Sequence, residues 1–152
     1  MGALVRRVCE VARPKLNALG VRVDLNVSDV LPVIANPVEL ELGLLNLLTN
    51  SLDAMPSGGV VTITVTPGPD TVCIDVTDTG KGIAPDLLPR IFDAWVTTKE
   101  AGHGTGLGLS ITREVIEAHG GTITARSEAG AGATFILTLP GSVERVEDGA
   151  TV

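Results

Sequence analysis

The stretch that most constrains the fold is residues 36–55, which read NPVELELGLLNLLTNSLDAM. Its first residues have the features of a helix N-terminus. Asn36 is a favourable N-cap, Pro37 suits the first helical position, and Glu39 stands three residues after the cap, as in a capping box. We therefore predict one long helix over these residues.

Leucines cover most of the circumference of this helix at about 100° per residue, so we predict that it is largely buried. The leucines are Leu40, Leu42, Leu44, Leu45, Leu47, Leu48 and Leu52. A narrow polar stripe remains, made of Glu39, Gly43, Asn46, Asn50 and Asp53. A buried amide without a partner costs about 1–3 kcal/mol. The stripe is therefore either a structural hydrogen-bond network or the wall of a polar ligand cavity, where asparagine oxygens also suit Mg²⁺.

The composition limits the partners and the compartment. The chain of 152 residues is 44% hydrophobic and only 2% aromatic, which predicts one domain with a core of Leu, Val, Ile and Ala. A net charge of −7 without a basic run argues against a nucleic-acid partner but is compatible with a metal-bridged nucleotide. Cys9 and Cys73 match no metal or redox spacing, so we predict buried thiols in a reducing compartment.

The sequence contains no apolar run of membrane-spanning length and no signal-peptide pattern. We predict a cytoplasmic location without membrane contact for this stretch, which leaves open an anchor elsewhere in a longer protein.

Periodicity and turn residues predict the other elements. Helical spacing covers residues 3–19, with an interruption at Pro14, and residues 110–119, while residues 85–92 form a short helix or two turns. Strands are predicted at residues 21–27, 60–65, 72–78, 122–127 and 133–139, and residues 141–152 form a polar tail. The fold class is α+β: a two-layer α/β sandwich, with a mixed sheet of about five strands and three main helices on one face.

Asp78 follows a predicted buried strand and precedes the glycines of DTGKGI. A carboxylate only accepts hydrogen bonds, so it suits an exocyclic amine such as adenine N6 and repels the carbonyl that guanine carries there. The alternative is an ordinary Asx turn without a ligand.

The glycine-rich segment GHGTGLGLSI runs from residue 102 into a predicted helix, after a loop at residues 93–105 that has no periodicity. Closely spaced glycines before a helix let backbone N–H groups reach phosphate oxygens. The spacing fits neither common phosphate-binding loop, and a loop without a ligand stays possible. Lys99 is either a contact for a terminal phosphate or a surface lysine, and we interpret His119 as structural.

The order NLLTNSLDAM, DTGKGI, IFDAWVTTK and GHGTGLGLSI resembles the N, G1, F and G2 boxes of the sensor histidine kinase catalytic domain. That domain has the Bergerat-type ATP-binding fold, shared with gyrase, the heat-shock chaperone ATPases and MutL. The resemblance extends from about residue 20 to 140. The NSLDAM and TTK variants resemble the nitrogen-regulation type.

The resemblance implies ATP and Mg²⁺ as cofactors. Asn50 would bind Mg²⁺ on the ATP phosphates, Asp78 would accept from adenine N6, and Thr134 would hold a water beside Asp78. Asn46, Asn50 and Lys99 would be catalytic. The implied nucleotide-binding set is Asn46, Asn50, Asp53, Asp78, Gly80, Gly82, Ile83, Thr98, Lys99, Gly102, His103, Gly104, Thr105, Gly106, Leu107, Gly108, Leu109 and Thr134. Asp53 replaces a lysine of many kinases, so its role stays open.

The hydrolytic members of the superfamily carry a glutamate four residues before the metal-binding asparagine. This chain has Asn46 there, and an amide cannot act as a general base. Glu39 lies about 16 Å from Asn50 along a helix, which is too far to substitute. The sequence therefore favours phosphoryl transfer over efficient hydrolysis.

The acceptor implied by the resemblance is a histidine on a dimerisation domain, and the phosphoryl group then passes to a response regulator. We find no such histidine here, so we predict a junction helix at residues 1–20, an ATP-binding catalytic domain at residues 21–140, and a monomer in isolation. Two alternatives stay open. One is a stand-alone serine kinase of the anti-sigma-factor type, which usually carries the glutamate that this chain lacks. The other is a non-catalytic nucleotide-binding module.

Overall fold

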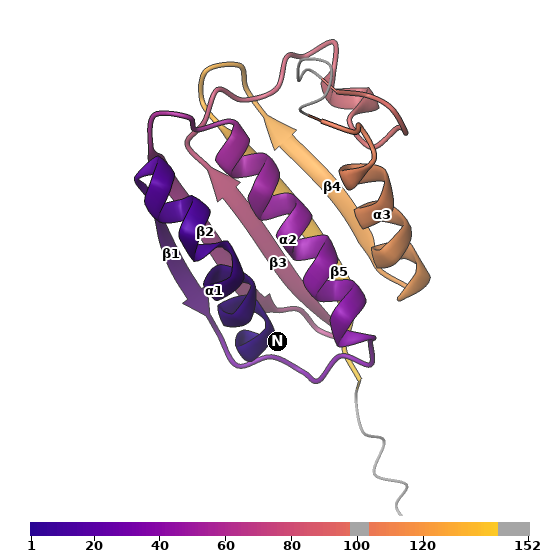
Figure 1. Ribbon diagram of the computed structural model, residues 1–152. Helices are drawn as coiled ribbons and strands as arrows, with labels where there is room; N and C mark the ends of the chain where they lie inside the picture. Colours follow the sequence, from indigo (N-terminus) through magenta and orange to yellow (C-terminus); the bar gives the residue numbers. More distant parts are fainter. Residues whose placement is uncertain (98–103, 143–152) are drawn as a thin grey trace, which may run out of the picture.

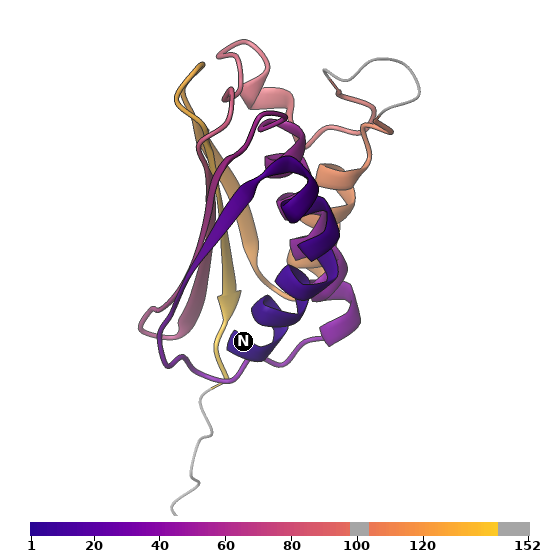
Figure 2. The ribbon, with the colours of Figure 1, turned by 60° about the vertical axis from the view of Figure 1, so that its left-hand side comes forward.

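The computed structural model describes residues 1–97 and 104–142. Its elements are α1 (Gly2–Leu19), β1 (Val21–Val27), α2 (Pro37–Asp53), β2 (Gly59–Pro67), β3 (Thr71–Asp78), the 3₁₀ turn η1 (Leu88–Arg90), α3 (Gly108–Ala118), β4 (Thr122–Ser127) and β5 (Ala133–Pro140). The five strands lie in the order β1-β2-β3-β5-β4. The three α-helices pack on one face of the sheet (Figures 1 and 2). This arrangement confirms the predicted two-layer fold.

The sheet is mixed, because β1 pairs with β2 in parallel while the other neighbouring strands are antiparallel. Burial alternates along β2, β3 and β5, with side chains such as Ile63, Val76 and Leu137 buried toward the helices. One face of the sheet packs on the core and the other is solvated. Leu47, Leu48 and Leu52 of α2 are 0% exposed, so α2 is the central helix of the core.

The start of α2 confirms Asn36 as the N-cap, since its Oδ1 accepts from the N–H groups of Val38 at 3.0 Å and Glu39 at 3.4 Å. The predicted capping box is not completed by Glu39. The N–H of Asn36 instead donates to Nε2 of His119 at 3.0 Å, while Nδ1 of His119 lies 2.7 Å from the carbonyl oxygen of Val115. These bonds fit a neutral ring protonated at Nδ1. His119 therefore joins the end of α3 to the start of α2, a structural role.

The helix predicted at residues 3–19 is confirmed, but the interruption at Pro14 and the burial of Leu42 are not. Pro14 lies inside α1 without ending it, because Pro14 and Glu10 are both exposed and water can bind the Glu10 carbonyl that loses its helical partner. Leu42 is 50% exposed, since α1 and α3 flank α2 and leave an outward strip of it uncovered.

Helix α1 belongs to the same core as the rest of the fold. Val5, Val8, Ala12 and Leu16 are buried, and α1 contacts both α2 and β1. None of the helices in the described residues is long and apolar enough to cross a membrane.

The two cysteines are unpaired and half-buried, rather than buried as predicted. Burial raises the pKa of the Cys9 thiol. Burial and the neighbouring Asp75 carboxylate raise the pKa of the Cys73 thiol. Both groups are therefore protonated near neutral pH.

Candidate nucleotide-binding site

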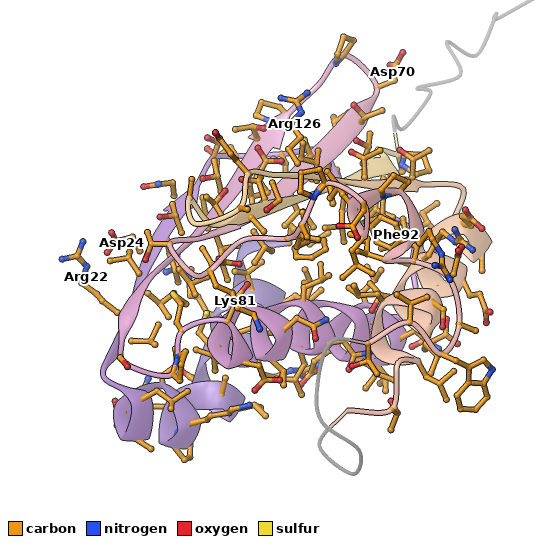
Figure 3. All side chains as sticks on the ribbon, turned by 90° about the horizontal axis from the view of Figure 1, so that it is seen from above. Arg22, Asp24, Asp70, Lys81, Phe92 and Arg126 are labelled. Carbon is orange, nitrogen blue, oxygen red and sulfur yellow. The ribbon has the colours of Figure 1, made fainter. Side chains whose placement is uncertain are left out.

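A cavity of about 400 Å³ opens where α2 and β3 end, next to the turn between β4 and β5 (top of Figure 1). Figure 3 looks onto this end of the molecule and labels Lys81 in the loop after β3. The lining is mostly apolar with a few polar groups, which is typical of a small-molecule site. The lining residues are Asn50, Asp53, Ala54, Asp78, Lys81, Gly82, Ile83, Ala84, Leu87, Ile91, Val96, Thr97, Leu109, Ala129, Ala133 and Phe135.

Asp78 is the buried acid of this cavity. It is the last residue of β3, is 3% exposed and points to the helix side of the sheet, as Val76 does. Its Oδ1 accepts from the N–H of Gly80 at 2.9 Å and from the N–H of Ala133 at 3.3 Å. The bond to Gly80 is the Asx turn that the sequence allowed. Asp78 also lines the cavity, so the turn does not prevent its carboxylate from facing that space.

The loop after β3 and the turn between β4 and β5 interlock through their glycines. Gly82 has φ +70° and a side chain there would collide with the carbonyl of Glu128, while Gly132 has φ +85° and abuts the carbonyl of Asp78. The N–H of Gly130 donates to the carbonyl of Lys81 at 2.7 Å. Backbone packing therefore holds this end of the cavity in place.

Ser127 ties the same two turns together, and the sequence analysis missed it. Its Oγ accepts from the N–H of Ile83 at 2.7 Å and donates to the carbonyl of Gly132 at 2.7 Å. One signal was present: Ser127 takes the inward position of β4 after Ile123 and Ala125, where an apolar residue is expected. Lys81 was also missed, because a lysine between two glycines looks like an ordinary surface residue.

The polar stripe of α2 divides into two parts. Asn50 and Asp53 line the cavity. Asn46 does not line it, since its Nδ2 donates to the carbonyl of Gly108 at 3.4 Å and to Oγ1 of Thr112 at 3.5 Å, which fastens α2 to the first turn of α3. Part of the stripe therefore forms a structural hydrogen-bond network and part of it lines a cavity.

The glycine-rich segment is described from Gly104 onward. Of its predicted contacts Leu109 lines the cavity, whereas Gly104, Thr105, Gly106, Leu107 and Gly108 do not. The Gly106 carbonyl accepts from the N–H of Trp95 at 2.9 Å, and Oγ1 of Thr105 accepts from the N–H of Leu107 at 3.3 Å. Thr98, Lys99, Gly102 and His103 lie outside the described residues.

The prediction for Thr134 is wrong. Its Oγ1 bonds Oγ1 of Thr77 at 3.0 Å on the outer face of the sheet, opposite Asp78. Side chains alternate along a strand, so an assignment shifted by one residue selects the wrong face. The neighbouring Ala133 lines the cavity and bonds Asp78 through its N–H.

Comparison with known proteins finds relatives over most of this chain. The family described as "Histidine kinase-, DNA gyrase B-, and HSP90-like ATPase" matches residues 35–143. The sensor histidine kinase ZraS of Escherichia coli K12 is 38% identical over 146 residues, which are 95% of this chain and 31% of ZraS. The sensor protein FixL of Bradyrhizobium diazoefficiens is 43% identical over 115 residues, 74% of this chain and 22% of FixL. The chain spans less than a third of these curated relatives.

Solved structures show the same fold. The catalytic domain of histidine kinase ThkA superposes with a TM-score of 0.82 at 30% identity, covering 93% of this chain and 92% of that one. Full-length ShkA in complex with AMPPNP gives a TM-score of 0.83 at 33% identity, over 93% of this chain and 30% of ShkA. The chain therefore belongs to the histidine kinase-, DNA gyrase B- and HSP90-like ATPase family, and its relatives within that ATP-binding family are the catalytic domains of sensor histidine kinases.

Proposed function

We propose that this chain is the catalytic domain of a two-component sensor histidine kinase. It binds Mg-ATP and transfers the γ-phosphate to a histidine on a separate dimerisation domain. The observation that carries the proposal is one cavity lined by both the buried carboxylate of Asp78 and the amide of Asn50.

Asp78 selects adenine. Its Oδ1 is fixed by two backbone N–H groups, so the carboxylate has a defined direction and acts as an acceptor. An amine at the base edge gains a charge-assisted hydrogen bond there, and a carbonyl is repelled. Apolar side chains such as Ile83 and Ile91 line the same cavity and suit a flat base.

Asn50 and the end of α2 form the phosphate side. The asparagine oxygen is a hard ligand that suits Mg²⁺, so the residues present fit the metal. Bound Mg²⁺ neutralises charge on the phosphates. The protein contributes position and electrostatics, as phosphoryl transfer requires. Lys99, Thr98 and the remaining glycines of the segment belong to this side in the proposal.

The residue at position 46, Asn46, favours phosphoryl transfer over hydrolysis of ATP. The amide of Asn46 cannot take a proton from water, and it is engaged with α3 through Gly108 and Thr112. The other cavity carboxylate, Asp53, is bound to Lys15. We therefore expect slow release of free phosphate from Mg-ATP by this chain alone.

The partners in this proposal are a histidine-bearing dimerisation domain and a response regulator. A relative, ThkA, has been solved in complex with the response regulator TrrA. We propose a cytoplasmic location, supported by the protonated, unpaired thiols and by the use of ATP.

The test is a phosphotransfer assay with Mg-ATP and a dimerisation domain from a matching kinase. Phosphate appearing on histidine, labile in acid, supports the proposal. Acid-stable phosphoserine supports the serine-kinase alternative, and ATP binding without transfer supports a non-catalytic module. The Asp78→Asn variant is the negative control, and Thr124→Ala, on the outer face of β4, is the matched positive control.

A further inference from the structure

We propose that Trp95 and Gly106 form a backbone clasp that positions Val96 and Thr97 in the wall of the cavity. The inference rests on the proposed function and assigns positioning residues to it. The clasp is the contact between the two backbones, in which the N–H of Trp95 donates to the carbonyl of Gly106 at 2.9 Å. Both residues have a left-handed backbone, with φ +69° at Trp95 and +68° at Gly106.

Glycine is required at residue 106 because the two backbones are so close. A Cβ on Gly106 would lie 2.7 Å from the carbonyl carbon of Trp95 and 2.8 Å from its Cα, which is closer than real Cβ atoms come to such groups. Backbone atoms of Trp95 cannot turn aside as the end of a flexible side chain can. The clasp therefore depends on the absence of a side chain at this position.

Trp95 has an unusual backbone for its residue type. Among the described residues it is the non-glycine residue with a positive φ, and a bulky residue there is an outlier. Contacts of its indole with the cavity do not explain the conformation, since the side chain is 73% exposed and does not line the cavity. Strained backbone of this kind persists where its surroundings hold it, and it clusters at ligand sites. The clasp to Gly106 holds it here.

The clasp joins two stretches that line the cavity. Val96 and Thr97 directly follow Trp95 and line the cavity, and Leu109 lines it shortly after Gly106. The left-handed turn at Trp95 directs the chain inward at Val96 while the indole stays outside. The clasp therefore fixes where the chain enters this wall of the cavity.

The first test compares two glycine-to-alanine variants by titration with Mg-ATP and by urea unfolding. Gly106→Ala opens the clasp, and we expect it to weaken Mg-ATP binding about 5- to 20-fold because Val96 and Thr97 lose their positions. Gly20→Ala is the matched control, since Gly20 has φ +67°, nothing lies within 4 Å of its Cβ, and it does not line the cavity. We expect this control to lose stability through its left-handed φ and to bind Mg-ATP as the wild type does.

The second test separates the backbone of Trp95 from its indole. Trp95→Asn and Trp95→Val both remove the indole, but asparagine adopts a left-handed backbone more readily than a β-branched valine. We expect Trp95→Asn to bind Mg-ATP within about twofold of the wild type and Trp95→Val to bind about 3- to 10-fold more weakly. Without nucleotide, amide hydrogen exchange at residue 95 should stay slow in Trp95→Asn and become faster in Trp95→Val.

Four results overturn the clasp as a positioning device. Unchanged Mg-ATP affinity in Gly106→Ala, or the same loss in Gly20→Ala, removes the clasp from nucleotide binding. Equal losses in Trp95→Asn and Trp95→Val mean that the indole matters and the backbone does not. A loss in Gly106→Ala with wild-type binding by Trp95→Val means that residue 106 contacts the nucleotide directly.

Each of these results leaves the proposed function standing if the wild type binds Mg-ATP. A wild type that does not bind Mg-ATP overturns the proposed function itself.

Discussion

The two ends of the cavity are built in different ways. At the end that we propose for the base (the base end), Asp78 is 3% exposed and held by two backbone N–H groups, and the glycines of the adjoining turns lie close to carbonyl groups. At the end that we propose for the phosphates (the phosphate end), the half-buried side chains of Asn50 and Asp53 extend from the last turns of α2, and Lys15 of α1 forms an ion pair with Asp53. We infer that the base end depends on backbone geometry, while the phosphate end depends on charge.

The largest effect is expected for a substitution that disturbs the packing between the loop after β3 and the turn between β4 and β5. Gly132→Ala places a Cβ against the Asp78 carbonyl at a left-handed φ, so we expect the free energy of unfolding to fall by about 2–4 kcal/mol. Gly130→Ala is the matched control, since its φ is also positive but nothing lies near its Cβ, and about 1 kcal/mol is expected. Urea unfolding measures both. Equal losses in the two variants would show that the close approach is relieved cheaply.

The second largest effect is expected for a substitution of the Asp78 carboxylate. Asp78→Asn keeps the volume but puts an amide where a charged acceptor stood, which costs about 1.5–3 kcal/mol and weakens ATP binding about 10- to 100-fold. Isothermal titration of folded protein measures the change. Unchanged affinity would remove Asp78 from the base end.

A smaller effect comes from the side chain that joins the two turns. Ser127→Ala removes the acceptor of the Ile83 N–H and the donor to Gly132, so we expect a stability loss of about 1–3 kcal/mol and about 3- to 10-fold weaker ATP binding. Thr124→Ala, two residues earlier and exposed, is the control for strand propensity. A loss of stability with normal affinity would mean that Ser127 supports the turns without shaping the base end.

The smallest effect is expected for a substitution of Ser51, on the buried side of α2. Among the described residues Ser51 Oγ has no hydrogen-bond partner although Ser51 is 1% exposed. Removing an unsatisfied buried hydroxyl is favourable, so Ser51→Ala should raise the free energy of unfolding by about 1 kcal/mol and leave ATP affinity unchanged. Thermal unfolding with a parallel titration tests this. A destabilised variant would indicate that the hydroxyl is bonded.

Much of the fold was predictable because it depends on local patterns. Alternation of residues such as Val61, Ile63 and Val65 marked the strands, and the Asn36–Pro37 pair marked the start of α2. The exceptions depend on tertiary contacts. The N–H of Asn36 finds His119 from the end of another helix, and Leu42 is exposed because of where α1 and α3 lie.

The site was predictable where a residue's own position in its element decides its direction. Asp78 ends an alternating strand on its buried face, and Asn50 and Asp53 lie on one stripe of a helix. Asn46 shares the stripe but contacts α3. The prediction for Thr134 was shifted by one residue, because the neighbouring Ala133 lines the cavity and Thr134 lies on the outer face of the sheet. Ser127 bonds two segments that are distant in the sequence, and its local signal was only a serine at an inward position of β4.

The most direct test of the central claim is a titration of the wild-type chain with Mg-ATP and Mg-GTP under identical conditions. In the proposed function, the Asp78 carboxylate accepts a hydrogen bond from the adenine amine and repels the guanine carbonyl. We therefore predict that Mg-ATP binds at least about tenfold more tightly than Mg-GTP. Equal affinity for the two nucleotides would contradict the assignment of Asp78 to the base and with it the account of the cavity.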